Sequence, residues 1–470
     1  MGKKKKTIEE LLEESLVVEE VQPYQVPENW IWINLGSCLE SIQYGYTETA
    51  SSEEIGPKFL RITDIQNDKV DWNSVPYCKI NEKDLKKYLL KDDDIVVART
   101  GATTGKSYLI NKPAIAVFAS YLIRLRKSKG IYPKYLWNYM KSPMYWKQIM
   151  VVKKGSAQPG ANAQILSNLS LPLPPLNEQK RIAEKVENLL KKIEEAKTLI
   201  EEAKETFELR RAAILDKAFR GKLTKEWHGQ HTIKNIDVEY LNEPFKIPQS
   251  WRWIQLGEIL EMQNGLSKRR GTTGKNIPVL RLADIKNGKI VTNDLREILL
   301  TEKETEKYKL KMNDLMFIRV NGSFDLVGKA IVFDIPLDAA YCDHLIRATI
   351  KSNEVNSRYI SYFFESPFMR EQLRSKIVSS AGQNTISQGS LLSLWIPIPP
   401  KEECEQLVID LENVLSKEQK ILEKMQEMDK LKRIQQSILS KAFCGELGTN
   451  DPTEESAIEL LKDVLQEKIK

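Results

Sequence analysis

The stretch that decides the fold runs from Ile182 to Phe207 and reads IAEKVENLLKKIEEAKTLIEEAKETF. Apolar residues recur in it at alternating steps of four and three, at Ile182, Val186, Leu189, Ile193, Ala196, Ile200, Ala203 and Phe207. This spacing is the seam of a coiled coil, because it keeps one apolar stripe on one side of a helix. No Gly or Pro interrupts the segment before Gly221, which stands where a C-terminal glycine ends a helix. The sequence therefore predicts a long helix with one side that another helix covers.

A second segment of the same kind offers the partner. Its expected seam residues are Leu407, Leu411, Val414, Ile421, Met425 and Met428, with Glu418 at one seam position. It also lacks Gly and Pro until Gly445. If the first helix leads out of one block and the second returns from the other, the pair is antiparallel. An intermolecular coiled-coil dimer is the alternative, but two such helices within one chain favour pairing inside the chain.

The whole chain repeats itself at an offset of about 220 residues. Pro27-x-x-Trp30 with Leu35-Gly36 recurs as Pro248-x-x-Trp251 with Leu256-Gly257, Pro172-x-Pro174-Pro175 as Pro397-x-Pro399-Pro400, and Lys217-Ala218-Phe219-x-Gly221 as Lys441-Ala442-Phe443-x-Gly445. So many pairs in register indicate an internal duplication.

Each repeat begins with a block of mixed character. Alternating apolar runs predict strands at 94–99, 107–110 and 121–126, with counterparts at 315–319, 329–333 and 345–350. One helix is expected over 134–150, with a twin over 358–377. Short amphipathic tail helices, 7–18 and 454–467, are expected to meet near the first block.

We therefore predict an α+β fold with an internal pseudo-twofold repeat, in which two mixed domains are joined by two long antiparallel coiled-coil helices. The expected boundaries are 1–22 for an N-terminal tail helix, 23–176 for the first mixed domain, 177–222 for the first long helix, 223–245 for a linker, 246–400 for the second mixed domain, 401–447 for the second long helix and 448–470 for a C-terminal tail helix.

Charge is distributed unevenly along the chain. The net charge is only +6, yet no Asp or Glu occurs between Ile95 and Asn177, a stretch that holds 12 Lys or Arg residues among many aromatic ones. Such a stretch favours a polyanionic partner, because basic side chains that neutralise phosphates release counterions. A merely basic surface is the alternative.

Two sets of residues are candidate DNA contacts. Basic residues near glycine, where the backbone can approach a phosphate closely, are Arg99, Gly101, Lys106, Arg319, Gly322 and Lys329. Amide side chains able to pair with adenine, in the loops before each Pro-x-Pro-Pro, are Gln158, Asn162, Gln383 and Asn384. A loop-capping role is the alternative for each of them. Arg61 and Arg281, each three residues before an Asp, are expected to form structural ion pairs.

Motifs for catalysis or metal binding are missing from the sequence. The Asn-Pro-Pro-aromatic signature of adenine methyltransferases does not occur, and Gly101–Ser107 is one residue short of a phosphate-binding loop. The three His residues lack partners at metal-ligand spacing, and the five Cys residues are scattered. We therefore expect no catalytic residues, no metal and no cofactor, and a cytoplasmic protein with free thiols and no membrane span.

The layout of block, long helix, block, long helix resembles the specificity subunits of type I restriction–modification enzymes over nearly the whole chain. The motifs that carry the resemblance are Pro27-x-x-Trp30 with Leu35-Gly36, Leu173-Pro174-Pro175-Leu176-Asn177-Glu178-Gln179, Ile214-Leu215-x-Lys217-Ala218-Phe219-x-Gly221-x-Leu223, and the tail from Asn450 to Leu461. The chain departs from the pattern at Cys404, where the motif has Gln, and in extra residues in the loop 155–164.

The resemblance implies a non-catalytic subunit that reads a split target in double-stranded DNA, one half with each target-recognition domain. It implies two modification subunits, which bind S-adenosylmethionine and methylate adenine, and restriction subunits that use ATP and Mg²⁺ for translocation and cleavage. A self-contained restriction enzyme and a coiled-coil scaffold without DNA function are the alternatives.

Overall fold

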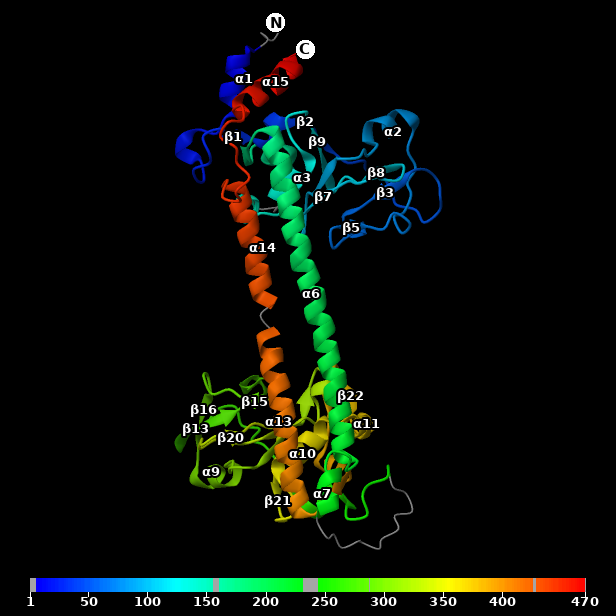
Figure 1. The fold of residues 1–470 in the computed structure, drawn as a ribbon, viewed down its shortest axis with the longest axis vertical. Helices are drawn as coiled ribbons and strands as arrows, with labels where there is room; N and C mark the ends of the chain where they lie inside the picture. Colours follow the sequence, from blue (N-terminus) through cyan, green and yellow to red (C-terminus); the bar gives the residue numbers. More distant parts are fainter. Residues whose placement is uncertain (1–5, 155–159, 231–243, 287, 426–427, 470) are drawn as a thin grey trace. The chain divides into compact units, whose positions relative to one another are not determined.

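The computed structural model describes residues 6–154, 160–230, 244–286, 288–425 and 428–469, with side chains except at 152–154, 228–230, 419, 423–425 and 428–429. The chain forms two compact units, Met1–Leu199 with Glu427–Lys470 and Ile200–Gln426 (Figure 1). The longest helix, α6 (Leu176–Phe219), begins in the first unit and ends in the second. The boundaries between the two units therefore fall within the long helical segments, at Leu199/Ile200 and Gln426/Glu427. The domain boundaries expected from the sequence lie instead at the ends of these segments.

The first unit is built around a four-stranded antiparallel sheet in the order β2-β9-β6-β7. Its strands are β1 (Ile31–Asn34), β2 (Leu39–Tyr44), β3 (Lys58–Leu60), β4 (Ile65–Gln66), β5 (Lys69–Val70), β6 (Ile95–Ala98), β7 (Ser107–Leu109), β8 (Ala116–Phe118), β9 (Leu122–Lys127) and β10 (Ser170–Leu173). Its helices besides α6 are α1 (Ile8–Ser15), α2 (Glu82–Tyr88), α3 (Pro133–Tyr139), α4 (Pro143–Lys154), α5 (Ala163–Ser167), α14 (Met428–Phe443) and α15 (Ala457–Ile469). Because all four residues of β6 are buried, this apolar run forms the centre of the sheet.

The second unit repeats this plan with a sheet in the order β12-β21-β17-β19. Its strands are β11 (Arg252–Gln255), β12 (Leu260–Asn264), β13 (Lys275–Leu280), β14 (Ile285–Lys286), β15 (Lys289–Ile290), β16 (Arg296–Leu300), β17 (Leu315–Ile318), β18 (Val320–Asn321), β19 (Ala330–Val332), β20 (Ala340–Tyr341), β21 (Leu345–Ile350), β22 (Val378–Ser380), β23 (Gln383–Thr385) and β24 (Trp395–Ile398). Its helices are α7 (Lys225–Gln230), α8 (Leu256–Ile259), α9 (Glu302–Tyr308), α10 (Ser357–Glu365), α11 (Pro367–Arg374), α12 (Gln388–Leu392) and α13 (Lys401–Met425). The strand pairs β1–β10 and β11–β24 occupy the same place in the two units, which confirms the α+β duplication.

The single helix expected over 134–150 is wrong, because the structure has two helices there. α3 ends before Ser142, and α4 begins at Pro143. The twin region breaks in the same way between α10 and α11, at Ser366-Pro367. Proline disfavours the helical conformation of the residue before it but fits the first turn of a new helix. The Ser-Pro pair therefore ends one helix and begins the next in both units.

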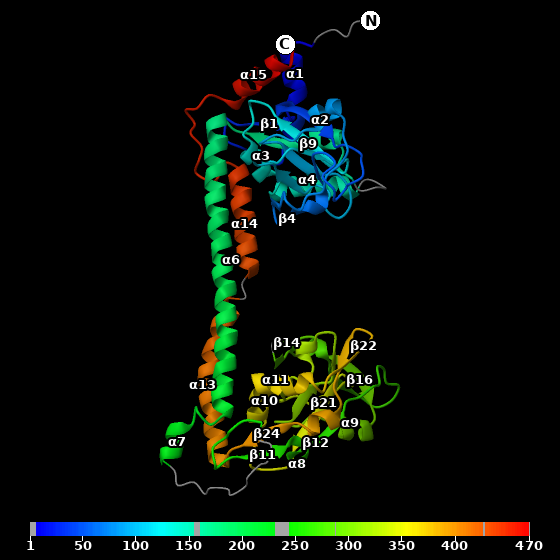
Figure 2. The same ribbon diagram turned by 90° about the vertical axis from the view of Figure 1, so that its right-hand side faces the viewer.

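Within each unit, the two long segments run antiparallel. In the second unit Arg210 pairs with Glu418 at 2.9 Å, while Phe219, further along α6, shares a core with Leu407, earlier on α13. In the first unit, Ile182 near the start of α6 shares a core with Phe443 at the end of α14. The ribbon of Figure 2 shows both pairings.

The apolar stripe of α6 is buried most completely near its ends. Ile182 and Val186 are fully buried and Ile193 is 7% exposed, whereas Leu189, Ile200 and Phe207 are half-buried. The partly covered residues lie toward the middle of the helix. Packing against the mixed domains thus adds burial that the second helix alone does not provide.

On α13 the covered positions follow the expected seam at Leu407, Leu411 and Glu418 but depart from it by one residue at Leu415 and Leu422. Leu407 and Leu411 are buried and Val414 is half-buried, but Ile421 is 43% exposed, so its assignment to the seam is wrong. The covered residues after Leu411 are Leu415, Glu418 and Leu422. Because α10 also packs on α13, the helix is apolar on two adjoining sides, and spacing alone does not select the side that faces α6. The side chains of Met425 and Met428 lie outside the described residues.

Gly221 and Gly445 end the two helices, as the sequence predicts. Each has a positive φ, +67° and +76°, and the N–H of the following residue donates to the carbonyl of Lys217 or Lys441 at 2.9 Å. A Cβ at these positions would lie 2.2 Å from Pro248 and 2.4 Å from Pro27. Both the backbone conformation and the close approach of proline therefore require glycine.

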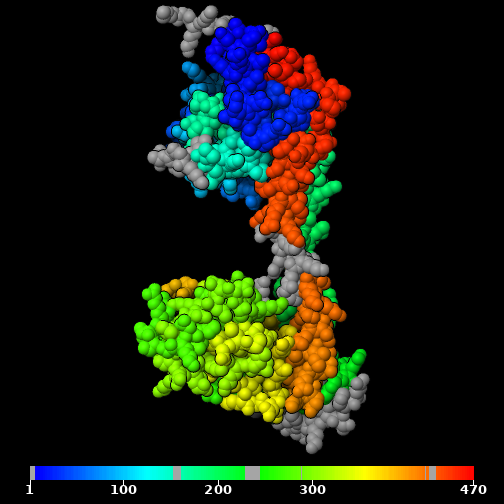
Figure 3. Space-filling model, turned by 90° about the vertical axis from the view of Figure 1, so that its left-hand side faces the viewer, coloured from blue at the N-terminus to red at the C-terminus, as the bar shows by residue number. Residues whose placement is uncertain are grey.

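The ends of the chain lie together on the first unit. α1 contacts α15, and Figure 3 shows the N-terminal segment in blue beside the C-terminal segment in red. The N–H of Ala457 donates to the carbonyl of Asn29 at 3.0 Å. The tail helices therefore meet on the first mixed domain, as expected. Among the described helices, none combines the length and apolar character needed to span a bilayer.

Candidate nucleic-acid interface

In the first unit the predicted basic residues surround the turn between β6 and β7. Arg99 directly follows β6, is exposed, and places its guanidinium 4.9 Å from the ring centre of Tyr44. Gly101 has φ of +80°, and its carbonyl accepts a hydrogen bond from the Thr104 hydroxyl at 2.7 Å, which closes a tight turn. Lys106 is exposed at the end of this turn. The turn thus presents two cations beside a glycine that leaves the backbone accessible.

The second unit has a related but longer turn between β17 and β19. Arg319 is half-buried, and its guanidinium donates to the carbonyl of Asp343 at 3.2 Å. Gly322 and Lys329 are exposed at the two ends of the loop. Because part of Arg319 is already bonded within the protein, Lys329 is the more accessible of these two cations.

The amide candidates have different roles in the structure. Asn162 caps α5, because its side-chain oxygen accepts from the N–H of Ile165 at 2.8 Å. Asn384 donates to the carbonyl of Gly322 at 2.9 Å and accepts from the Ser379 hydroxyl at 2.5 Å. Gln383 is exposed at the start of β23. Gln158 lies outside the described residues.

In both units the structure brings the basic turn and the amide loop together. The N–H of Ala161 donates to the carbonyl of Arg99 at 2.8 Å, and the N–H of Ile386 donates to that of Arg319 at 3.0 Å. Residues more than 60 positions apart therefore form one polar surface in each domain. This surface is our candidate interface.

Sequence reasoning did not select the residue just before β9 or β21. Tyr121 is 64% exposed, and its carbonyl accepts the N–H of Arg99 at 2.9 Å. His344 occupies the same place in the second unit, and its carbonyl accepts the N–H of Arg319 at 2.8 Å. An aromatic ring directly before each of these strands was the available signal. Such rings can stack or donate at a nucleic-acid surface.

Arg61 and Arg281 form the structural ion pairs expected from the sequence. Each guanidinium meets a carboxylate three residues on, Asp64 at 2.7 Å and Asp284 at 2.9 Å. These carboxylates also accept the N–H of the arginine itself, so each pair closes a short turn. For both arginines, hydrogen bonding to the carboxylate raises the pKa above its ordinary value.

One group of potential metal ligands occurs among the described residues. Cys342, Asp343 and His344 are consecutive, and their ligand atoms lie within 4.8 Å of one another. Burial raises the pKa of the Cys342 thiol, which disfavours the thiolate that binds metals. The group is better explained by the turn that supports Arg319.

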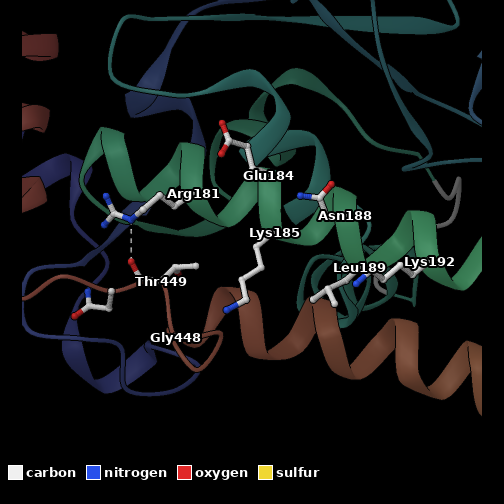
Figure 4. A pocket seen from close by; sticks show the side chains of 9 residues that line it. Arg181, Glu184, Lys185, Asn188, Leu189, Lys192, Gly448 and Thr449 are labelled. Carbon is white, nitrogen blue, oxygen red and sulfur yellow. Dashed lines mark hydrogen bonds between the residues drawn. The ribbon is translucent and has the colours of Figure 1, made fainter.

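A shallow hollow of about 470 Å³ lies where α6 begins (Figure 4). It is lined by Arg181, Glu184, Lys185, Asn188, Leu189, Lys192, Gly448, Thr449 and Asn450. Arg181 donates to the carbonyl of Thr449 at 3.0 Å. The hollow therefore belongs to the junction between the helix and the C-terminal segment, and it contains none of the predicted DNA contacts.

Comparison with known proteins assigns the family. The family described as the type I restriction modification DNA specificity domain matches residues 27–205 and 248–441. The chain belongs to this family. The two matches correspond to the two halves of the duplication, each including a mixed domain and much of the long helix that follows it.

The relatives and solved structures agree with this assignment. The chain is 32% identical over 395 residues to the type I restriction enzyme StySPI specificity subunit of Salmonella potsdam, covering 83% of this chain and 82% of the relative. It is 27% identical to the EcoKI specificity subunit of Escherichia coli K12, covering 90% of each. A chain from a structure of complex assembly in the type I R-M system has the same fold, with a TM-score of 0.66, 21% identity, and coverage of 90% of this chain and 100% of that one. The HsdS subunit of Thermoanaerobacter tengcongensis matches with a TM-score of 0.53, 20% identity, and coverage of 90% and 99%.

Proposed function

We propose that this specificity subunit reads a bipartite target in double-stranded DNA, one half-site with each mixed domain. In this proposal it directs adenine methylation or cleavage that partner subunits carry out. The chain itself contributes recognition and assembly and no catalytic group.

The duplicated basic turn is the observation that carries this proposal. Arg99 and Arg319 directly follow the matching strands β6 and β17. The backbone carbonyl of each accepts a hydrogen bond from the loop that precedes a Pro-x-Pro-Pro segment. The turns that follow differ in length and side chains. Two domains with the same strands but different turns are suited to reading two different half-sites. Phosphate contacts position a domain on DNA, while base contacts determine which sequence it binds.

The partners follow from the family. We propose two modification subunits, which supply S-adenosylmethionine and methyl transfer, and restriction subunits, which supply ATP, Mg²⁺ and cleavage. The paired helices α6, α13 and α14 offer the frame that joins the two readers.

The test is a domain exchange. Replacing residues 246–395 with the corresponding block of another specificity subunit should change one half-site of the methylated sequence and leave the other unchanged. The reciprocal exchange of residues 23–170 should change only the other half. Genome-wide mapping of methylated adenine measures both outcomes, and a change in both halves, or in neither, contradicts the two-reader proposal.

A second measurement addresses the division of labour. The purified chain alone should show no methyl transfer, and transfer should appear when the modification subunit is added. Binding of the purified chain to DNA should weaken steeply as salt rises, because phosphate contacts release counterions. A scaffold without DNA function would show no such slope, and activity of the pure lone chain would refute the subunit assignment.

A further inference from the structure

A small three-stranded sheet, β18-β23-β22, carries a two-stranded ribbon in the second unit. In the ribbon Val378 pairs with Thr385, Ser379 with Asn384, and Ser380 with Gln383. Ala381 and Gly382 form its turn with φ of +47° and +78°, which fits the two-residue turn that suits twisted ribbons. Figure 2 shows β22 at the edge of the unit, away from α13.

The two sides of the ribbon are chemically different. Directly paired residues point to the same side, so Ser379 and Asn384 share one side with Asn321 of β18. This side is held by hydrogen bonds from Ser379 to Asn384 and from Asn384 to the carbonyl of Gly322. Asn384 is therefore a positioning residue that fixes the ribbon against the turn after β18.

The opposite side presents Val378, Ser380 and Gln383. All three are exposed, with Val378 exposed to 64%. Within the described part of the chain, the side-chain hydroxyl of Ser380 and the side-chain amide of Gln383 have no hydrogen-bonding partner, whereas their backbones pair in the ribbon. This side of the ribbon therefore exposes a valine and two polar side chains that are free to bond an external ligand. The hydrogen bonds on the opposite side fix the backbone that carries them.

The charge around the ribbon favours DNA as that ligand. No Asp or Glu occurs from Gln372 to Lys401. Lys376, just before β22, is exposed, and so is Lys329 at the end of the neighbouring loop. The major groove admits a two-stranded ribbon, and glutamine pairs with two atoms of adenine there. Serine can contact either kind of base, and valine can meet the thymine methyl group.

We propose that the β22–β23 ribbon enters the major groove of the half-site read by the second domain, and that Gln383 reads an A·T pair there. This inference rests on the proposed function, since it names the reading residue within that domain. Ser380 lies beside Gln383, and Lys376 contacts a flanking phosphate.

The experiment uses the full chain assembled with its modification subunit. A library of DNA duplexes randomised at one position at a time in the wild-type target is methylated by the wild type and by Gln383→Ala. We expect Gln383→Ala to lower discrimination about 5- to 100-fold at one A·T position of the second half-site, because one bidentate contact is lost. Discrimination at every position of the first half-site should stay unchanged.

Two further variants make the result specific. Gln249→Ala removes an exposed glutamine of the same unit outside the ribbon and should leave the target unchanged. Lys376→Ala should weaken binding to all sequences and reduce the salt slope by about one, without changing base preference. Thermal melting should be the same for all variants, because each removed side chain is exposed.

The outcomes separate this inference from the function on which it rests. If the wild-type complex methylates a bipartite target and Gln383→Ala retains full discrimination at every position, the ribbon is not the reader. Relaxation in the first half-site, or at a position other than A·T, also overturns the inference. A wild-type complex that methylates no bipartite target would instead refute the proposed function.

Discussion

Each unit contains a buried junction of the same kind, but the two units differ in which helices cover the mixed domain beside it. In the first unit the Trp30 indole donates to Glu178 at 2.7 Å, and the Thr449 hydroxyl donates to the same carboxylate at 3.4 Å. In the second unit the Thr224 hydroxyl donates to Glu403 at 2.6 Å. In the first unit the start of α6 meets the segment that follows α14, and in the second unit the start of α13 meets the segment that follows α6.

Only the first unit carries the tail helices. A Cβ at Gly130 would lie 2.5 Å from a methyl group of Val464 on α15, so glycine lets the helix approach. The matching residue of the second unit is the exposed Glu354, which pairs with Arg252. The comparison teaches that the duplication repeats the buried frame, while the surfaces beside it acquire separate roles.

The largest expected effect tests whether the two frames are equivalent. The ring of Phe443 lies 5.3 Å from Tyr135 and 5.2 Å from Tyr139, and Phe219 lies 5.3 Å from Tyr359 and 4.8 Å from Phe363. Phe443→Ala and Phe219→Ala should each lower the free energy of unfolding of the protein by about 3–5 kcal/mol, because both rings are buried. Hydrogen exchange should locate each loss in the unit that holds the ring. Loss of protection in both units from one substitution would show that they do not behave as separate frames.

A smaller effect is expected at the junction carboxylate. Glu178→Ala leaves the buried Trp30 indole without its acceptor and should cost about 1–3 kcal/mol. Burial raises the pKa of Glu178 above its ordinary value, so the neutral Glu178→Gln should cost less than Glu178→Ala. Chemical denaturation of both variants measures the difference. Equal costs would mean that the negative charge of the carboxylate, and neither the volume nor the hydrogen-bond acceptor that Gln retains, holds this junction.

The ion pair that ties down the C-terminal segment should contribute less still. Arg181 meets Glu454 through two hydrogen bonds, of 2.8 and 2.9 Å, with side chains 37% and 19% exposed. A double-mutant cycle with Arg181→Ala and Glu454→Ala should give a coupling of about 0.5–1 kcal/mol, because solvent screens the pair. Gln406→Ala, at the matching place in the second unit, is the control. A coupling near zero would leave the other hydrogen bonds of this segment, such as that of Thr449 to Glu178, and the apolar contacts of α15 to hold the tail.

The smallest effect distinguishes the observed seam from the expected one. Ile421→Ala should change stability by less than about 1 kcal/mol, whereas Leu415→Ala should cost about 2–5 kcal/mol. The reason is exposure, 43% for Ile421 and 3% for Leu415. Denaturation curves of the two variants check this, and similar costs would restore the spacing predicted from the sequence.

Local patterns in the sequence were sufficient for the frame. The strand runs, the seam of α6 and the two helix-ending glycines depend on neighbours within a few residues, and the repeat is found by matching two sets of such local patterns. The six strands expected from these runs match β6, β7, β9, β17, β19 and β21 to within about one residue, whereas the other strands were not predicted. The helix break at Ser142-Pro143 was missed although proline signals it locally.

The candidate contacts required tertiary structure. Asn162, Asn384 and Gln383 look alike in sequence, since each is an amide in a polar loop. Only the fold shows that Asn162 caps a helix, that Asn384 bonds a glycine carbonyl 62 residues away, and that Gln383 remains exposed.

The sequence by itself determined that this chain is a duplicated pair of mixed domains with two long amphipathic helices, because periodicity and turn residues act over short range. The tertiary structure decided which side of α13 faces α6, which amides are used internally, and where the tails dock. Thr449 reaches Glu178 across 271 residues of chain. Such contacts depend on how distant segments pack, and a local pattern contains no information about a partner so far away.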